Sequence, residues 1–115
     1  MAAEEERFVA THPRSAAHSA ESEHLLGGVP MAWMARWPGA FPLVVDRASG
    51  AGFTDVDGID YVDFCLGDTG AMAGHGLTFL TEALAAQAER GITTMLPSTD
   101  ASWVAAELHR RFTLP

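Results

Sequence analysis

Three aspartates beside one glycine, Asp55, Asp57 and Asp60 around Gly58, place oxygen ligands near a tight turn, as a calcium site requires. An EF-hand loop, however, needs an oxygen ligand where Ile59 stands and a glycine where Asp60 stands. The Asp57–Gly58 pair is typical of a two-residue hairpin turn of the primed type, because both residues tolerate a positive φ. We therefore expect a β-hairpin at this position and no metal site.

The segment Gly67–Asp68–Thr69–Gly70 suggests a second chemistry, that of paired carboxylates. It resembles the signature of aspartic proteases, in which an aspartate on a glycine-rich turn shares a proton with a second aspartate. Proteases of the retroviral type are homodimers of chains of similar length. Those chains are nearly all β, whereas two helices are predicted after residue 76 here, so this interpretation is the weaker one.

The single cysteine and the histidines lack the partners that nucleophilic catalysis requires. Cys65 falls in the apolar alternation of a predicted strand, and we expect it to be a core thiol. His75 stands between two glycines and is expected to be a loop histidine bonded to the backbone. His12, His18 and His24 are spaced by six residues, which on a helix rotates successive side chains by about 240°. We expect these three to be solvated.

The basic residues are all arginines, because the 115-residue chain has seven basic groups and no lysine. A mechanism in which a side-chain amine forms a Schiff base therefore requires a lysine from another chain.

Charge and composition exclude several classes of protein. The formal net charge of −8 opposes binding to nucleic acid and to anionic membrane surfaces. The single cysteine cannot form an intramolecular disulfide, which favours a reducing compartment. The sequence shows neither a secretory signal nor an apolar run of about 20 residues. These features together predict a soluble cytoplasmic protein.

The positions of prolines, glycines and apolar residues predict the elements of the first half. Residues 13–26 are expected to form a helix that starts at a proline and ends at a glycine pair. Residues 29–42 are expected to be ordered but irregular, with their tryptophans packed against another surface. A three-stranded antiparallel meander with one apolar face is predicted from strands at residues 43–45, 52–56 and 59–66.

The second half is predicted to be a loop followed by two helices. Residues 67–76 contain four glycines without periodicity, which is typical of a loop. A helix is expected over residues 77–90, with Gly91 as its stop, followed by an extended stretch to residue 97. N-capping residues at positions 98–100 predict a further helix that ends near residue 112.

These elements make an α+β chain with three parts: a flexible N-terminus at residues 1–12, a helix, irregular segment and meander at 13–66, and a loop with two helices at 67–115. A meander this small can bury only one face, and the tryptophan-rich segment needs a further surface. The sequence therefore favours the N-terminal piece of a larger protein over a small closed domain.

Residues 50–64 resemble the N-terminal hairpin of class III pyridoxal-phosphate-dependent aminotransferases, in which the pattern G-x-x-[x]-x-D-x-D-G-x-x-Y-x-D leads into the first active-site loop. Three further segments are similar to segments of glutamate-1-semialdehyde aminomutases and occur in the same order. They are Leu26–Gly27–Gly28–Val29, Gly74–His75 and residues 91–97. The resemblance covers residues 15–115.

This resemblance implies a fold-type I enzyme in which the chain supplies part of the small domain, one wall of the active site and surface for a homodimer. The cofactor would be pyridoxal 5'-phosphate, and the substrate a small amino acid or amine. The main cofactor-binding residues, including the Schiff-base lysine, would belong to the remainder of the aminotransferase chain. No catalytic residue is expected among residues 1–115.

The resemblance also implies which residues contact the substrate. Trp33, Met34 and Arg36 would line the substrate entrance, and Asp68 and Thr69 would project toward the substrate amine or a water. Asp68 stands where the aminomutases carry a tryptophan, which changes the pocket from apolar to acidic. A related amino acid or amine is therefore as good a candidate substrate as glutamate-1-semialdehyde.

Two further residues, Thr93 and Thr94, would lie near the dimer interface. The alternative to an enzyme segment is a non-catalytic α+β module for interaction or dimerisation. Continuation of the reading frame past Pro115 into a glycine-serine/threonine motif and a later lysine would distinguish the enzyme from this module.

Overall fold

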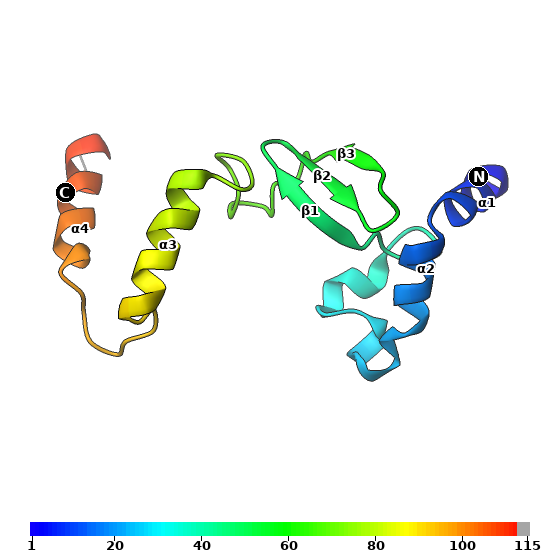
Figure 1. The fold of residues 1–115 in the computed structure, drawn as a ribbon, viewed down its shortest axis with the longest axis horizontal. Coiled ribbons are helices and arrows are strands. Elements are labelled where there is room, and N and C mark those ends of the chain that lie inside the picture. Colours follow the sequence, from blue (N-terminus) through cyan, green and yellow to red (C-terminus); the bar gives the residue numbers. More distant parts are fainter. Residues whose placement is uncertain (113–115) are drawn as a thin grey trace. The chain divides into compact units, whose positions relative to one another are not determined.

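The computed structural model describes residues 1–112, which divide into two units, Met1–Thr78 and residues 79–112. Helices and a three-stranded antiparallel sheet are both present, as predicted (Figure 1). The helical elements of the first unit are α1 (Ala2–Thr11), α2 (Pro13–Ala20) and the short 3-10 turns η1 (Ser22–His24), η2 (Leu26–Gly28) and η3 (Ala32–Arg36). Its strands are β1 (Val45–Ser49), β2 (Gly52–Asp55) and β3 (Asp60–Val62), in the order β1-β2-β3.

The N-terminal ten residues form helix α1, which differs from the flexible segment expected for residues 1–12. Glu4 and Glu5 lie in its first turn, where a negative charge is favourable to the helix dipole. The ring of Phe8 stacks on His12 at 4.3 Å and lies 5.1 Å from the ring of Phe41. Tertiary contact with a residue distant in sequence therefore supports a helix that local pattern did not predict.

Helix α2 begins at Pro13, as predicted, but ends at Ala20 instead of residue 26. The hydroxyl of Ser22 donates to the carbonyl of His18 at 2.7 Å, and this local bond competes with continued helix. The predicted glycine pair, Gly27 and Gly28, lies further on, inside η2, and both glycines have left-handed φ values of 72° and 71°.

The β1–β2 hairpin is shifted relative to the prediction. The predicted strand at residues 43–45 begins only at Val45 and continues to Ser49, which pairs with Gly52. Gly50, with a φ of 55°, therefore lies in the turn between β1 and β2.

The β2–β3 connection is a three-residue loop, not the predicted two-residue turn. The N–H of Gly58 donates to the carbonyl of Asp55, and the N–H of Asp55 donates to the carbonyl of Ile59, both at 3.0 Å. Only Gly58 takes a positive φ, 88°, while the carboxylate of Asp55 accepts from the N–H groups of Asp57 and Ile59. This side-chain bonding fixes the longer turn.

The third strand ends at Val62 instead of residue 66. The carboxylate of Asp63 accepts the N–H groups of Cys65 and Leu66, both at 2.9 Å, which turns the chain out of the sheet. Cys65 is consequently exposed and is not the core thiol that the apolar alternation predicted.

The least accessible part of the first unit is polar. Three side chains, which we call the polar cluster, join α1 and α2 to the hairpin. They belong to His12, Asp55 and Tyr61. The His12 Nε2 lies 2.6 Å from the Tyr61 hydroxyl and 3.5 Å from Asp55 Oδ2, and that hydroxyl donates to Asp55 Oδ2 at 3.1 Å. His12 is therefore buried, contrary to the prediction of a solvated side chain.

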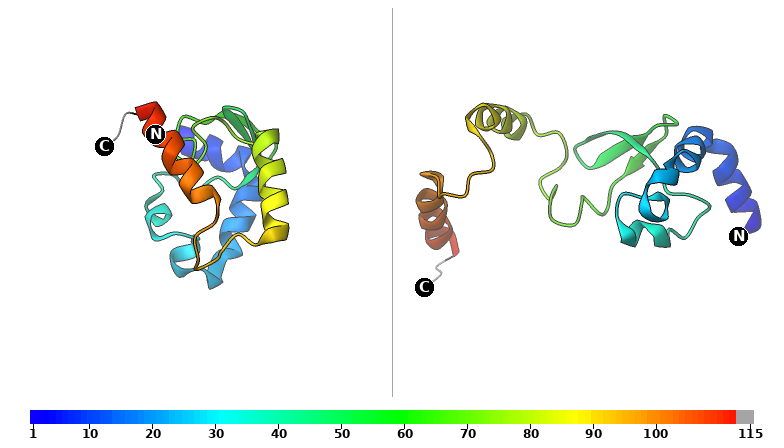
Figure 2. Two further views of the ribbon diagram at one scale, coloured as in Figure 1. Left: turned by 90° about the vertical axis from the view of Figure 1, so that its left-hand side faces the viewer. Right: turned by 90° about the horizontal axis from the view of Figure 1, so that it is seen from below.

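A second polar contact fixes the start of α2 beside the hairpin (Figure 2). The two carboxylate oxygens of Asp57 accept the N–H groups of Arg14 and Ser15 at 2.7 and 2.9 Å, and the Ser15 hydroxyl donates at 2.8 Å. Partial burial alone would raise the pKa of Asp57, but these hydrogen bonds bring that pKa below its ordinary value. The N-cap position of α2 is His12, and the distant Asp57 side chain satisfies the first N–H groups of the helix as a capping side chain does.

The apolar side chains are mostly outside. Among residues 1–112 the buried apolar residue is Val29, whereas Phe64 is 95% exposed, Trp33 68% and Val62 67%. The sheet face predicted to be apolar is therefore uncovered within this unit, and the face that carries Tyr61 is the one that the N-terminal helices cover.

The second unit contains the two helices predicted for it, α3 (Thr78–Arg90) and α4 (Asp100–Phe112). Gly91 follows α3 with a φ of 95°, as expected for a glycine stop. The residues 92–97 between the helices form neither helix nor strand, and bends at Ile92, Met95 and Leu96 interrupt the extended stretch that was predicted. None of the residues described in α3 or α4 is buried in this unit.

The single tyrosine gives a direct test of the polar cluster. Burial and the hydrogen bond to Asp55 raise the pKa of Tyr61 to about 12. The folded pKa lies above the unfolded value of about 10, so this contribution to stability is complete below pH ~10 and is lost as the pH rises through ~12. Ultraviolet titration of tyrosinate should show the high midpoint in the folded chain. Denaturation in urea should lower this midpoint, and so should the Asp55→Asn substitution. A midpoint in the folded chain near that of the denatured chain would contradict the polar cluster.

Candidate functional site

The predicted entrance residues lie on and next to η3. Trp33 is exposed, and its indole N–H donates to the Met31 sulfur at 3.3 Å. Met34 is half-buried and lines a cavity of about 330 Å³. Arg36 ends η3 with an exposed side chain, and among residues 1–112 it makes no ion pair. η3 thus presents an aromatic ring, a thioether and a guanidinium within four residues.

The cavity beside Met34 is mainly apolar. It lies between α2, the 3-10 turns and the segment leading into β1, and its walls include Leu25, Val29, Met34, Leu43 and Val45. A pocket of this composition fits an apolar group, and its polar walls are His18, Ser19 and Ser22. Of the predicted entrance residues, only Met34 contributes to it.

The other predicted contact residues lie on a loop, as expected, at residues 64–74. Leu66, Gly67 and Asp68 have successive positive φ values of 49°, 61° and 59°. This conformation costs a residue with a side chain about 1–2 kcal/mol, so the surrounding structure must hold it. The Asp68 carboxylate lies 3.7 Å from the Cys65 sulfur, and Thr69 is exposed.

A side-chain bond that the sequence did not predict closes this loop. The His75 Nε2 lies 2.7 Å from Asp63 Oδ2. The hydrogen bond from His75, with those from the Leu66 and Cys65 amides, holds the pKa of Asp63 below its ordinary value. The His75 side chain was expected to bond to the backbone, but its ring bonds to the Asp63 carboxylate, and only the backbone groups of His75 pair with Gly50.

The structure groups the predicted contact residues in two places. Asp68 and Thr69 share the loop, and Trp33, Met34 and Arg36 share η3. Among residues 1–112, no hydrogen bond, ion pair or ring contact joins the two groups.

Thr93 and Thr94, predicted for an interface, belong to the second unit and follow α3. Both are exposed, and the Thr94 hydroxyl donates to the carbonyl of Leu96 at 2.9 Å. A dimer contact at these residues stays a prediction.

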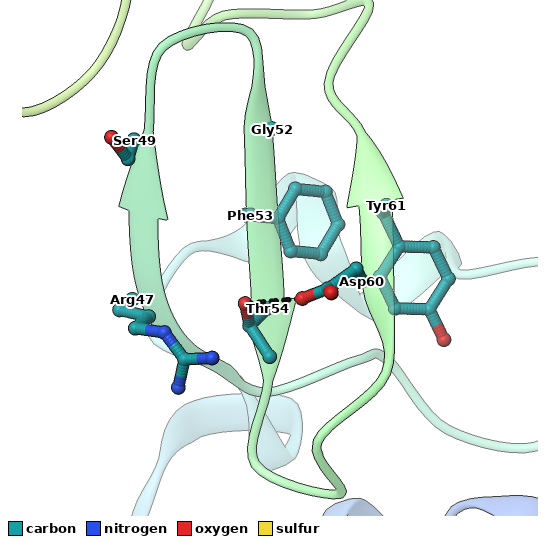
Figure 3. A pocket seen from close by; sticks show the side chains of 7 residues that line it. All are labelled: Arg47, Ser49, Gly52, Phe53, Thr54, Asp60 and Tyr61. Carbon is teal, nitrogen blue, oxygen red and sulfur yellow. Dashed lines mark hydrogen bonds between the residues drawn. The ribbon is translucent and has the colours of Figure 1, made fainter.

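A shallow hollow of about 200 Å³ on the sheet contains none of the predicted residues (Figure 3). The Thr54 hydroxyl donates to Asp60 at 2.6 Å, and the rings of Phe53 and Tyr61 stack at 4.9 Å. Arg47, at its edge, bonds to the neighbouring Asp46. Because these polar groups already have partners, the hollow carries no evident ligand site.

The part of the chain that the structure describes holds no cluster of three or more metal-ligating side chains. No helix within residues 1–112 has the length and apolar character needed to cross a membrane.

Known structures match this fold, although no protein-family model matches the chain. A glutamate-1-semialdehyde-aminomutase from Pseudomonas aeruginosa PAO1 is 54% identical over 97% of this chain and 25% of its own, with a TM-score of 0.89. A variant of it in complex with PMP matches equally well. A beta-phenylalanine aminotransferase from Variovorax paradoxus shares the fold at 24% identity and a TM-score of 0.83, over 96% of this chain and 25% of that one.

The chain is therefore homologous to the N-terminal quarter of the PLP-dependent aminotransferases and aminomutases. Within that class it is similar to a glutamate-1-semialdehyde aminomutase, which confirms the resemblance seen in residues 15–115. It spans about a quarter of the length of these solved structures.

The Asp63–His75 bond can be tested by titration. The Asp63 pKa is depressed in the folded state, so its contribution to stability is present above the unfolded value of about 3.9 and is lost as the pH falls through the folded pKa. Carbon NMR of the Asp63 carboxyl should show a midpoint below that of the urea-denatured chain. The His75→Ala variant should raise the midpoint, and an unchanged value would contradict the assigned bond.

Proposed function

We propose that this chain forms part of the small domain and one wall of the active site of a fold-type I, pyridoxal-phosphate-dependent aminotransferase or aminomutase. The enzyme would be a homodimer that acts on a small amino acid or amine. The observation that carries the proposal is the 54% identity to an aminomutase over 97% of the chain, together with a TM-score of 0.89.

The residues of this chain do not hold the cofactor by themselves. They include no lysine, and the net charge of −8 opposes binding of a phosphate dianion. Arg36 is the one cation among the predicted contact residues within residues 1–112. Pyridoxal phosphate, when bound, supplies an electron sink for a carbanion. The remainder of the aminotransferase chain would provide its lysine and its phosphate site.

The role of this chain would be to bind and orient the substrate. The exposed guanidinium of Arg36 suits a substrate carboxylate, because the two can form paired charge-assisted hydrogen bonds. The Asp68 carboxylate suits a substrate ammonium, and the neighbouring Thr69 hydroxyl can donate to or accept from it. Trp33 and Met34 would form an apolar wall that excludes water.

The exposed apolar side chains support this assignment. Trp33, Phe64 and Met72 are each more than half exposed, and large apolar side chains left exposed in this number are expected where other protein covers them. The remainder of the enzyme and its dimer partner would cover them. A cytoplasmic location stays a prediction.

The alternative is a non-catalytic α+β module for interaction or dimerisation. The absence of lysine and the same exposed apolar side chains are compatible with it. The two hypotheses differ in whether the native polypeptide carries a cofactor lysine.

The function is tested on the polypeptide as its gene encodes it. We expect a native mass several times the 12.2 kDa of these residues, because they match a quarter of an aminotransferase. We also expect the visible absorbance of bound pyridoxal phosphate, which an amino donor bleaches and a keto acceptor restores. Borohydride treatment should fix the cofactor to a lysine outside residues 1–115. A native mass near 12.2 kDa without cofactor absorbance would favour the module instead.

The role of Arg36 gives a separate prediction. Loss of a charge-assisted hydrogen bond costs about 1.5–3 kcal/mol, so Arg36→Ala should raise KM about 10- to 100-fold for substrates with a carboxylate. Amines that lack a carboxylate should be nearly unaffected. Arg7→Ala is the matched control, because Arg7 is exposed and paired with Glu4. Equal effects of Arg36→Ala on both substrate types would contradict carboxylate binding.

A further inference from the structure

The loop at residues 64–74 is closed by backbone bonds to the turn between β1 and β2. Asp63, just before the loop, donates its N–H to the Ala51 carbonyl at 2.8 Å. His75, just after it, donates to the Gly50 carbonyl at 2.8 Å and accepts the Gly50 N–H at 3.0 Å. The two ends of the loop are therefore fixed to two adjacent residues of one turn, Ala51 and Gly50.

One carboxylate adds a side-chain bond across the same base. Asp63 Oδ2 accepts from the His75 ring at 2.7 Å, while Oδ1 accepts from the amides of Cys65 and Leu66 at 2.9 Å. The Asp63 and His75 side chains are only 15% and 23% exposed, so water competes weakly for these bonds. Asp63 thus links the first residues of the loop to the residue that follows its end.

The loop is also bonded internally. Ala71 donates its N–H to the Leu66 carbonyl at 2.9 Å, and Gly70 donates to the Gly67 carbonyl at 3.0 Å. Asp68 lies between these bonds with a φ of 59°. Because its backbone is held on both sides, the direction of its carboxylate follows from the conformation of the whole loop.

We propose that Asp63 and His75 are positioning residues whose side-chain hydrogen bond keeps the loop closed and presents Asp68 and Thr69 to the substrate in one orientation. This inference rests on the proposed function for its substrate. A loop open at its base would leave Asp68 free to move, and a displacement of about 1 Å at a substrate contact can cost about 100-fold in rate.

The kinetic test uses the complete holoenzyme. His75→Ala should lower kcat/KM about 10- to 100-fold, mainly through a higher KM. His75→Gln should stay within about threefold of the wild type, because its amide can donate to Asp63 in place of the ring. His24→Ala is the matched control, because His24 is exposed and should leave kcat/KM unchanged. A loss in His75→Gln as large as in His75→Ala would overturn the proposal.

A double-mutant cycle separates positioning from general damage. Asp68→Ala should lower kcat/KM clearly in the wild type but by less than about twofold in the His75→Ala background, because that background has already misplaced Asp68. Equal losses from Asp68→Ala in both backgrounds would overturn the positioning role.

Hydrogen exchange gives a readout that does not depend on activity. Peptides covering residues 64–74 should exchange faster in His75→Ala and at the wild-type rate in His75→Gln, with peptides from β2 unchanged as evidence of folding. Unchanged loop exchange in His75→Ala would overturn the inference whatever the activity. A wild type that exchanges as expected but has no aminotransferase activity would instead contradict the proposed function and leave loop closure by the pair supported.

Discussion

The tertiary structure of the first unit depends on the contacts of His12 with Tyr61 and Asp55 in its least accessible region. A buried polar group without a partner costs about 1–3 kcal/mol, so each member of this polar cluster requires the other two. The cluster ties the N-terminal helices to the hairpin, and Asp57 repeats the connection by capping α2. With Val29 as the buried apolar residue of the described chain, these polar bonds carry much of the tertiary order.

Polar bonds hold the inner face, and the apolar surface stays on the outside. Phe64, Trp33 and Val62 are exposed, as expected for one quarter of an aminotransferase whose other parts would cover them. The same chemistry recurs at the loop of residues 64–74, where Asp63 and His75 join the two ends. In both places a carboxylate of the sheet region lies next to the histidine ring of a distant segment. This contact fixes how the two segments are arranged without a large apolar core.

Local pattern predicted those features whose cause is local. Helices α3 and α4 follow from apolar spacing, N-caps and the left-handed Gly91, and the loop at residues 67–76 follows from its glycines. The exposure of Cys65 and the early end of β3 could not be predicted in this way. They result from the side chain of Asp63, which bonds to the next amides, whereas an alternation of apolar residues indicates only a strand.

The sequence by itself determined the meander, the later helices, the homology to an aminotransferase and the absence of lysine from residues 1–115, because these depend on residue type, order and spacing. Tertiary structure alone decided that His12 is buried, that residues 2–11 are helical and that His75 bonds to Asp63. In the sequence, His12 and its partner Tyr61 are 49 residues apart, and Asp63 and His75 are 12 residues apart. Local periodicity cannot predict a hydrogen bond over such separations, because the bond forms only when the folded chain brings the two groups together.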